Sequence, residues 1–191
     1  MRRLLGFLLR CAVIPLFAVL AGCGTSSVPT ITSFSPASGA VGTTVTITGT
    51  GFSTTAASNT VKFNGTAATV TSATSTTLVT TVPSGATTGT ISVTVDGQTA
   101  STTSSFTVIP TMTSFSPSSG SAGTMVTITG TGFDGTTLSN NSVTFNGTSA
   151  TLTSATGTNI VATVPASATT GVISVTVYGV LVSSSSSFTV N

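Results

Sequence analysis

Apolar and polar residues alternate in short runs along most of this chain. Residues 43–49 and 89–96 are clear examples, because valine or isoleucine at every second position is separated there by threonine or serine. A period of two puts one set of side chains on the buried face of a β-strand and the other set in water. The pattern therefore predicts an all-β protein. In the first half of the chain, the runs lie near residues 30–35, 43–49, 60–64, 66–71, 77–82, 89–96 and 99–108.

Two copies of one module follow each other along the chain. Residues 28–36 recur as residues 109–117, 81 positions later, and the spacing becomes 82 by Phe145. We expect the single inserted residue to lie in a loop, because the pattern is intact on both sides of it. An internal repeat of this length predicts two domains, residues 28–108 and residues 109–191.

Turn signals separate the alternating runs. The dipeptides Asn64–Gly65, Asp96–Gly97 and Asn146–Gly147 each stand between two such runs. Both central positions of a tight two-residue hairpin need φ > 0, which these residues adopt most readily. With about seven short strands in each copy, the chain is expected to fold as two tandem immunoglobulin-like β-sandwiches.

The order of motifs in each copy resembles that of the IPT/TIG domain. In the first copy the motifs are Pro-Thr-Ile-Thr-Ser-Phe-Ser-Pro from Pro29, Thr-Ile-Thr-Gly-Thr-Gly-Phe up to Phe52, Val-Lys-Phe-Asn-Gly up to Gly65 and Ser-Phe-Thr-Val up to Val108. The resemblance implies an immunoglobulin-like fold of the E-set type over residues 28–190. It implies no single activity, because the family occurs in bacterial surface proteins, carbohydrate-active proteins, receptor ectodomains and transcription factors.

The first 22 residues have the pattern of an export signal. Arg2 and Arg3 stand near the start, and Cys11–Leu20 is apolar. A positive start followed by an apolar stretch is typical of a signal peptide. A permanent transmembrane helix needs about 20 apolar residues, and Arg10 splits this segment, which argues against one. We predict a lipoprotein signal peptide over residues 1–22.

Residues Leu20–Cys23 resemble the lipobox of bacterial lipoproteins. The resemblance implies cleavage before Cys23, acylation of its sulfur and a short tether over residues 23–27. Acyl chains contribute about 0.8 kcal/mol per buried CH₂, so several chains on Cys23 would hold the protein on the membrane. Gly24 stands where an aspartate favours inner-membrane retention in enterobacterial lipoproteins, so the resemblance favours the outer membrane or cell surface. The alternative is an exported protein with an unmodified cysteine beside its cleavage site.

The composition removes most catalytic chemistry. Of the 191 residues, 76 are threonine or serine, while the chain has four Lys and Arg, two Asp and Glu and no His. After the predicted signal peptide, Lys62, Asp96 and Asp134 are the only charged side chains. Acid-base and nucleophilic catalysis need titratable groups in defined arrangements, so we expect no enzyme. Two isolated carboxylates build neither a calcium nor a zinc site, and we expect no cofactor and no metal.

The same scarcity of charge predicts a weak pH dependence. Few protons can differ in number between the folded and unfolded states when so few groups titrate. We therefore expect the thermal midpoint to vary little between about pH 3 and 9.

Nucleic acid is excluded as a partner, and a glycan stays open. One lysine cannot neutralise a phosphate backbone. The run Gly130–Gly135 fits a dinucleotide-binding pattern, but no helix is expected after it and the first copy lacks the third glycine, so we predict a β-turn there. The chain has no Trp and one Tyr, and its phenylalanines after residue 28 occur as equivalent pairs, which marks them as core. Aromatic platforms for sugars are therefore scarce, although loop hydrogen bonds to a glycan remain open.

One difference between the copies stands out. Where the first copy has Asp96–Ala100, the second has Tyr178, Gly179, Val180, Leu181 and Val182. Three consecutive apolar residues in a strand cannot all face the same core. A locally repacked strand or loop is the first interpretation of this segment. The functional alternative is a contact surface for a partner or a second copy, formed by Tyr178, Val180, Leu181 and Val182.

These features predict a non-catalytic lipoprotein of the cell envelope. It would be exported, bound to the membrane through a lipid on Cys23, and would act as a surface spacer, adhesion element or assembly component with a protein partner or by self-association. The alternative from another functional class is a glycan-binding accessory protein for polysaccharide capture.

Overall fold

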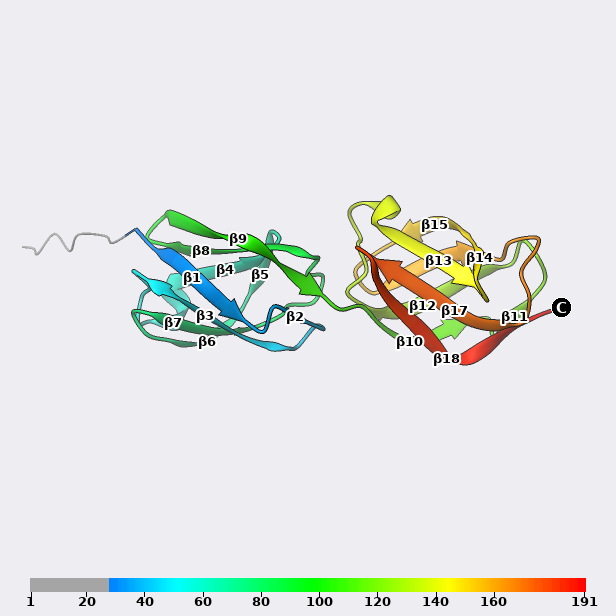
Figure 1. The fold of residues 1–191 in the computed structure, drawn as a ribbon, viewed down its shortest axis with the longest axis horizontal. Helices are drawn as coiled ribbons and strands as arrows, with labels where there is room; N and C mark the ends of the chain where they lie inside the picture. Colours follow the sequence, from blue (N-terminus) through cyan, green and yellow to red (C-terminus); the bar gives the residue numbers. More distant parts are fainter. Residues whose placement is uncertain (1–27) are drawn as a thin grey trace, which may run out of the picture.

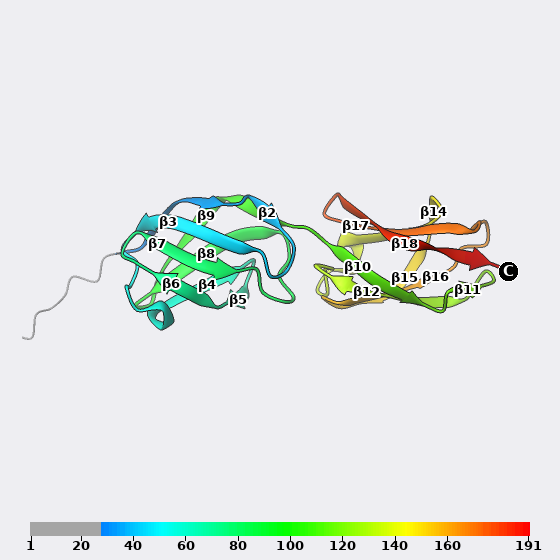
Figure 2. The ribbon, with the colours of Figure 1, turned by 90° about the horizontal axis from the view of Figure 1, so that it is seen from below.

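The computed structural model describes residues 28–191, and the predicted signal peptide and Cys23 lie outside the described residues. The described chain forms two β-sandwich modules that lie end to end. As Figure 1 and Figure 2 show, β1 starts at one end of the molecule and the C-terminus lies at the other. No helix within this part of the chain is long and apolar enough to cross a membrane.

The first module contains β1 to β9 in two sheets. One sheet has the order β1-β3-β7-β6 and the other the order β2-β9-β8-β4-β5. Only β2 and β9 pair in parallel within this module. The elements are β1 (Thr30–Ser35), β2 (Ser38–Gly39), β3 (Thr44–Thr50), the 3-10 turn η1 (Ala56–Ser58), β4 (Asn59–Phe63), β5 (Thr66–Ala68), β6 (Val70–Ala73), β7 (Thr77–Thr81), β8 (Gly89–Val95) and β9 (Gln98–Val108).

The second module repeats this arrangement with β10 to β18. Its sheets have the orders β10-β12-β16-β15 and β11-β18-β17-β13-β14, which match the first module strand for strand. The prediction of two tandem immunoglobulin-like sandwiches is confirmed. The elements are β10 (Thr111–Ser116), β11 (Ser119–Gly120), β12 (Met125–Thr131), η2 (Leu138–Asn140), β13 (Asn141–Phe145), β14 (Thr148–Ser149), β15 (Thr151–Ala155), β16 (Asn159–Thr163), β17 (Gly171–Val177) and β18 (Val180–Val190).

The single strand predicted over residues 66–71 is two strands in the structure. β5 pairs with β4 in one sheet, and β6 pairs with β7 in the other. The chain crosses between the sheets at Thr69, whose carbonyl oxygen accepts a 2.7 Å hydrogen bond from the Thr80 hydroxyl. The sequence has no turn signal at this one-residue crossing, so the alternating pattern of residues 66–71 predicts a single strand.

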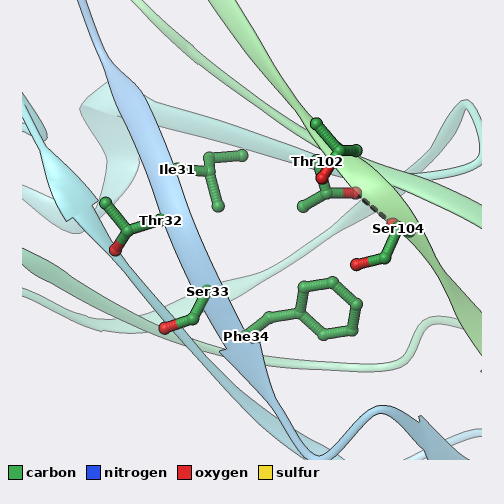
Figure 3. A pocket seen from close by; sticks show the side chains of 7 residues that line it. Ile31, Thr32, Ser33, Phe34, Thr102 and Ser104 are labelled. Carbon is green, nitrogen blue, oxygen red and sulfur yellow. Dashed lines mark hydrogen bonds between the residues drawn. The ribbon is translucent and has the colours of Figure 1, made fainter.

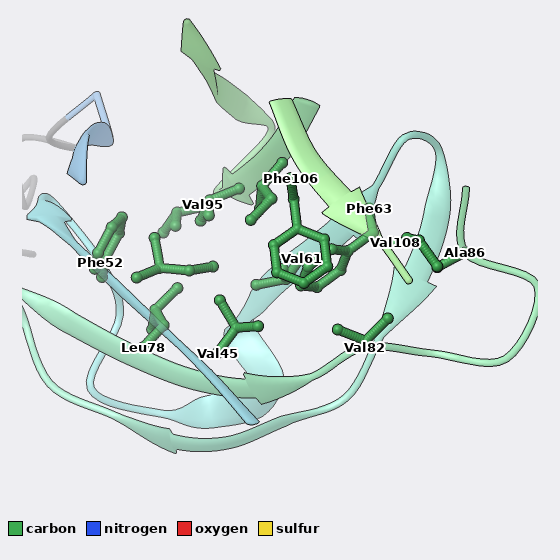
Figure 4. Packing of buried hydrophobic residues seen from close by; sticks show 13 residues of the cluster. Val45, Phe52, Val61, Phe63, Leu78, Val82, Ala86, Val95, Phe106 and Val108 are labelled. Atoms are coloured by element: carbon green, nitrogen blue, oxygen red, sulfur yellow. The ribbon is translucent and has the colours of Figure 1, made fainter. Parts of the chain in front are cut away.

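Each module has its own hydrophobic core between its two sheets, and Figure 4 shows that of the first. Phe63 and Phe106 pack edge to face with ring centroids 5.1 Å apart. Phe145 and Phe188 form the equivalent pair, also at 5.1 Å. Burying one such side chain contributes about 1.5–3 kcal/mol, and edge-to-face packing adds to that.

The predicted hairpins are confirmed, and a fourth tight turn joins them. Asn64, Asp96 and Asn146 have φ of 43°, 48° and 46°, each followed by a glycine that also has positive φ. Tyr178, which stands at the position of Asp96, has φ of 48°. Asparagine and aspartate tolerate this left-handed conformation, whereas a bulky residue there is an outlier. The conformation of Tyr178 therefore needs support from its surroundings.

Candidate functional site

The end of the second module that faces the first carries a cluster of polar side chains. Since β12, β15 and β17 all run towards this end, it gathers the loop 132–137, η2, the turn 156–158 and the turn Tyr178–Gly179. Figure 1 shows these segments beside the junction between the modules. Asp134, Gly157 and Tyr178, which differ from their counterparts in the first copy, lie here.

The loop after β12 is held by one buried asparagine. The Asn141 side chain accepts a 2.9 Å hydrogen bond from the Asp134 N–H and donates a 2.8 Å bond to the Asp134 carbonyl. In the first module, Asn59 makes the same two bonds with Ser53, both at 2.9 Å. Both asparagines are 5% exposed. This clamp belongs to the shared fold and sets the frame in which the two copies differ.

Asp134 is a completely buried carboxylate that accepts five hydrogen bonds. Its Oδ1 accepts from the Thr136 N–H at 2.8 Å, the Thr136 hydroxyl at 2.6 Å and the Thr137 N–H at 3.0 Å. Its Oδ2 accepts from the Asn140 amide at 2.7 Å and from the Tyr178 hydroxyl at 2.6 Å. Within residues 28–191 it forms no ion pair, so these hydrogen bonds compensate there for the burial of its charge.

These contacts shift both titratable groups of the cluster. Burial alone raises the pKa of the Asp134 carboxyl, but the hydrogen bonds that it accepts outweigh burial and hold the pKa well below its usual value. Burial raises the pKa of the Tyr178 hydroxyl, and the hydrogen bond to Asp134 and its negative charge act in the same direction. Asp134 is thus an anion and Tyr178 a neutral donor over a wide pH range.

The Asp134 cluster also explains the backbone of Tyr178. Its N–H donates to the Asn140 carbonyl at 3.3 Å, and its hydroxyl accepts a 3.0 Å bond from the Asn140 amide. A residue held in an unfavourable backbone conformation costs about 1–3 kcal/mol, and such contacts must offset that cost. Tyr178 remains 41% exposed. Its hydroxyl faces the cluster while part of its ring faces solvent.

The apolar segment after Tyr178 divides between the two sides of the sheet. Val182 packs against the core of the second module, and Val180 is half-buried. Leu181 points the other way and is 64% exposed. The structure therefore leaves Leu181, with the exposed part of Tyr178, as the portion of the predicted contact surface that another molecule can reach. The contact itself stays a prediction.

Among the hollows of the described residues, two are small gaps between sheet edges and another is wide and open. Figure 3 shows the gap of about 40 Å³ between β1 and β9, lined by Ile31, Phe34 and Thr102 among others. The second module has the same gap at about 20 Å³. Such volumes hold a water molecule or two and no sugar ring. The wide hollow, of about 590 Å³, lies beside η2 with Leu138 and Leu152 in its lining.

The structure does not bring the charged residues together. Asp96 lies in the turn between β8 and β9, at the end of the first module away from the junction, and Asp134 lies at the junction (Figure 1). Lys62 is exposed in the middle of β4. The difference between the copies at Tyr178 is visible in the sequence, but nothing in the sequence pattern joins it to Asp134, Asn140 and Gly157 in one region. Comparing the loops of the two copies position by position would have found them.

Comparisons with known proteins agree with this architecture. The IPT/TIG domain family matches residues 29–108 and again residues 110–190. No curated protein matches the chain. Among solved structures, a surface glycan-binding protein from Prevotella bryantii is 22% identical with a TM-score of 0.54, over 85% of this chain and 42% of that one.

Other solved structures are similar over smaller shares of their own length. An auxiliary nutrient binding protein from Bacteroides ovatus is 24% identical with a TM-score of 0.42, over 44% of this chain and 21% of that one. The extracellular region of plexin A4 is 21% identical with a TM-score of 0.42, over 90% of this chain and 19% of that one. The chain spans less than half of each of these proteins. The two matches to the family, together with the two sandwiches, establish that the chain belongs to the IPT/TIG family.

Proposed function

We propose that this chain is a non-catalytic spacer, adhesion or assembly module of the cell envelope, anchored through a lipid on Cys23. The observation that carries the proposal is the end-to-end arrangement of the two modules, with β1 at one end and the C-terminus at the other (Figure 1). At a rise of about 3.3 Å per residue, the strands give each module a length of roughly 25–35 Å. Such a molecule separates whatever binds its far end from the membrane.

The ionisable groups support a role without catalysis. Between residues 28 and 191 they are Lys62, Asp96, Asp134 and Tyr178. Both carboxylate oxygens of Asp134 are occupied by hydrogen bonds, and Asp96 lies in another module. A general acid or base needs a group that can exchange protons with a substrate near the working pH. This arrangement supplies no such pair.

The lipid anchor is tested by exchanging the two cysteines separately. Cells that produce the Cys23→Ser variant are grown with an alkyne-tagged fatty acid, and the Cys11→Ser variant is the matched control because its cysteine lies in the predicted signal peptide. We expect fatty-acid incorporation into the parent and the Cys11→Ser variant and none into Cys23→Ser. Incorporation into Cys23→Ser at the parent level would contradict the anchor.

The spacer role predicts which end is accessible from outside the cell. We expect an epitope placed after Asn191 to bind antibody on intact cells better than one placed after Ser27, because the second epitope lies beside the membrane. Outer-membrane or surface display requires both epitopes to be reached without permeabilisation. Equal binding at the two positions would argue against an extended spacer.

A contact through Leu181 is part of the proposal. This side chain is 64% exposed, and the first copy has Thr99 at the same position. Replacing Leu181 by threonine therefore keeps the strand and removes the apolar surface. We expect weaker self-association in sedimentation velocity, or weaker binding to producing cells, with an unchanged thermal midpoint. Unchanged association in both assays would remove Leu181 from the proposal.

A second candidate is glycan binding, favoured by the open hollow beside η2. Leu138 and Leu152 offer apolar surface there, and Thr136, Thr137 and Ser139 offer hydroxyl groups. The name of the Prevotella protein records glycan binding for that protein, and its similarity to this chain concerns the fold. The test is affinity electrophoresis of residues 28–191 through gels that contain soluble polysaccharides, with Leu138→Ser as the variant. Migration that no polysaccharide retards would eliminate this candidate.

A further inference from the structure

Three differences between the two copies lie where the modules meet. The end of the second module that carries them faces the first module, while the equivalent end of the first module points away from it (Figure 1). The sheets and the core aromatic pairs are the same in both copies, so the shared fold does not demand these exchanges. The exchanged pairs are Ser53 and Asp134, Ser75 and Gly157, and Asp96 and Tyr178.

Gly157 brings the backbones of the two modules into contact. A Cβ atom at Gly157 would lie 3.1 Å from the Cα atom of Gly85, in the loop between β7 and β8 of the first module. The serine found at this position in the first copy would press against that loop. Gly132 also lies against the first module, since a Cβ there would lie 3.1 Å from a methyl group of Val108, the last residue of β9. Glycine at these positions allows the modules to approach closely.

Tyr178 connects the Asp134 cluster to the first module. Thr87 of the first module is close enough to Tyr178 to act on its hydroxyl, whose pKa it lowers slightly against the larger effects of burial and Asp134. Thr87 is itself held by a 2.8 Å bond from the Asn64 side chain. Polar side chains therefore follow one another across the junction, from Asn64 and Thr87 in the first module to Tyr178 and the buried carboxylate of Asp134 in the second.

The burial of equivalent loops shows which surface is covered. Residues 83–88 of the first module correspond to residues 165–170 of the second. Each loop accepts a 2.8 Å bond on its equivalent threonine from an asparagine of a neighbouring hairpin turn, Asn64 or Asn146. Ala86 is fully buried and Thr87 is half-buried, whereas their counterparts Ala168 and Thr169 are half-buried and exposed. The hydrogen bonds within the two regions are the same, so the additional burial of Ala86 and Thr87 comes from the second module.

We propose that this end of the second module is a docking surface dedicated to loop 83–88 of the first module, and that it holds the two modules at one fixed angle. Relative motion is the usual expectation for two domains in one chain. Here only Ile109 and Pro110 separate β9 from β10, and the ring of Pro110 restricts the backbone further. The inference goes beyond the proposed function, because it concerns residues 28–191 and holds with or without an anchor at Cys23.

The docking surface selects the first module over a second copy of the chain. At its far end, the second module carries Ser167 where the first module carries Gly85. Gly85 has φ of 78°, which a serine rarely adopts, and Ser167 is not among the residues with positive φ. Another chain would therefore meet a differently shaped loop at that end. The docking surface therefore binds loop 83–88 of its own chain and does not join successive chains into a filament.

The test measures the spread of distances between the modules. Residues 28–191 contain no cysteine, so Thr103→Cys and Ser185→Cys place one spin label on an exposed site of each module. Pulsed electron paramagnetic resonance is compared between the parent and the Tyr178→Asp/Gly157→Ser variant, which carries the first copy's residues at both positions. The matched control is Leu181→Thr, which also carries the first copy's residue but lies outside the junction.

We expect a narrow distribution in the parent and the control, and one roughly twofold wider or more in the double variant, where the modules regain their default mobility. Circular dichroism checks that each protein is folded, and Gly157→Ser alone is measured if the double variant is not. A folded variant with the parent's distribution would overturn the proposal. So would a parent distribution as wide as that of the variant.

Discussion

The hydrogen bond between Tyr178 and Asp134 makes a quantitative prediction. The Tyr178→Phe variant keeps the ring and the backbone but removes the hydroxyl that donates to Asp134 at 2.6 Å. A hydrogen bond to a charged group contributes about 1.5–3 kcal/mol. Tyr178 is 41% exposed, so water can replace part of the lost bond and the lower end of that range applies. We expect the second module to lose about 1.5 kcal/mol of its free energy of unfolding.

The loss should appear in the second module alone. For a domain of this size, 1 kcal/mol changes the thermal midpoint by roughly 4–8 °C, so we expect a fall of roughly 6–12 °C. Calorimetry of residues 28–191 measures the midpoint. Amide hydrogen exchange assigns the change to a module, because faster exchange is expected in β17 and β18 and unchanged exchange in β8 and β9. Leu181→Thr serves as the control with an intact cluster.

A double-mutant cycle separates this bond from other effects of the substitution. In the Asp134→Ser background, which carries the first copy's residue, the hydroxyl of Tyr178 has lost its charged acceptor. We expect Tyr178→Phe to cost clearly less there, with an interaction free energy of about 1 kcal/mol or more. An equal cost in both backgrounds would refute the assignment of the stability to this pair.

Three further predictions test the core, the clamp and the pH dependence. Phe188→Ala should destabilise the second module by about 3–5 kcal/mol and leave the first unchanged, as measured by urea unfolding with exchange in each module, and Phe106→Ala should do the reverse. Asn141→Ala should cost the second module about 2–3 kcal/mol in the same assay, because buried backbone groups of the loop lose their partner; a cost below that of an exposed substitution would contradict the clamp. The lowered pKa of Asp134 stabilises the fold above the unfolded value of about 3.9 and this contribution is lost as the pH falls, so the thermal midpoint of the second module should drop below about pH 4, but not in Asp134→Ser. The raised pKa of Tyr178 stabilises the fold below about pH 10 and is lost as the pH rises through that value, and Tyr178→Phe should abolish the alkaline part of the profile.

The loss of stability that Asp134 predicts at acid pH differs from the flat pH dependence that the composition predicts. Few ionisable groups predict a flat pH dependence down to about pH 3, which assumes that each remaining carboxylate sits in a turn with ordinary solvation. Asp134 does lie in a loop, but it is buried and accepts five hydrogen bonds. A single carboxylate in such surroundings gives stability a pH dependence that its number alone does not suggest.

The sequence by itself determined the all-β class, the number of modules and the tight hairpins. These features depend on neighbouring residues: alternation selects a strand with one buried face, and Asn64–Gly65 supplies positive φ at two adjacent positions. An exact comparison of the copies also singled out Tyr178. The local sequence pattern does not predict the crossing at Thr69, because the crossing depends on which sheet each strand joins.

Tertiary structure alone decided what Tyr178 does. Its hydroxyl meets a carboxylate 44 positions earlier, and Gly157 meets Gly85 in the other module. Neither contact leaves a local pattern, since both arise from loops that antiparallel strands return to the same end of a sandwich. Apolar alternation fixes which side of a strand is buried, whereas the meeting of distant loops depends on how complete strands pair and on how one module is placed on the next.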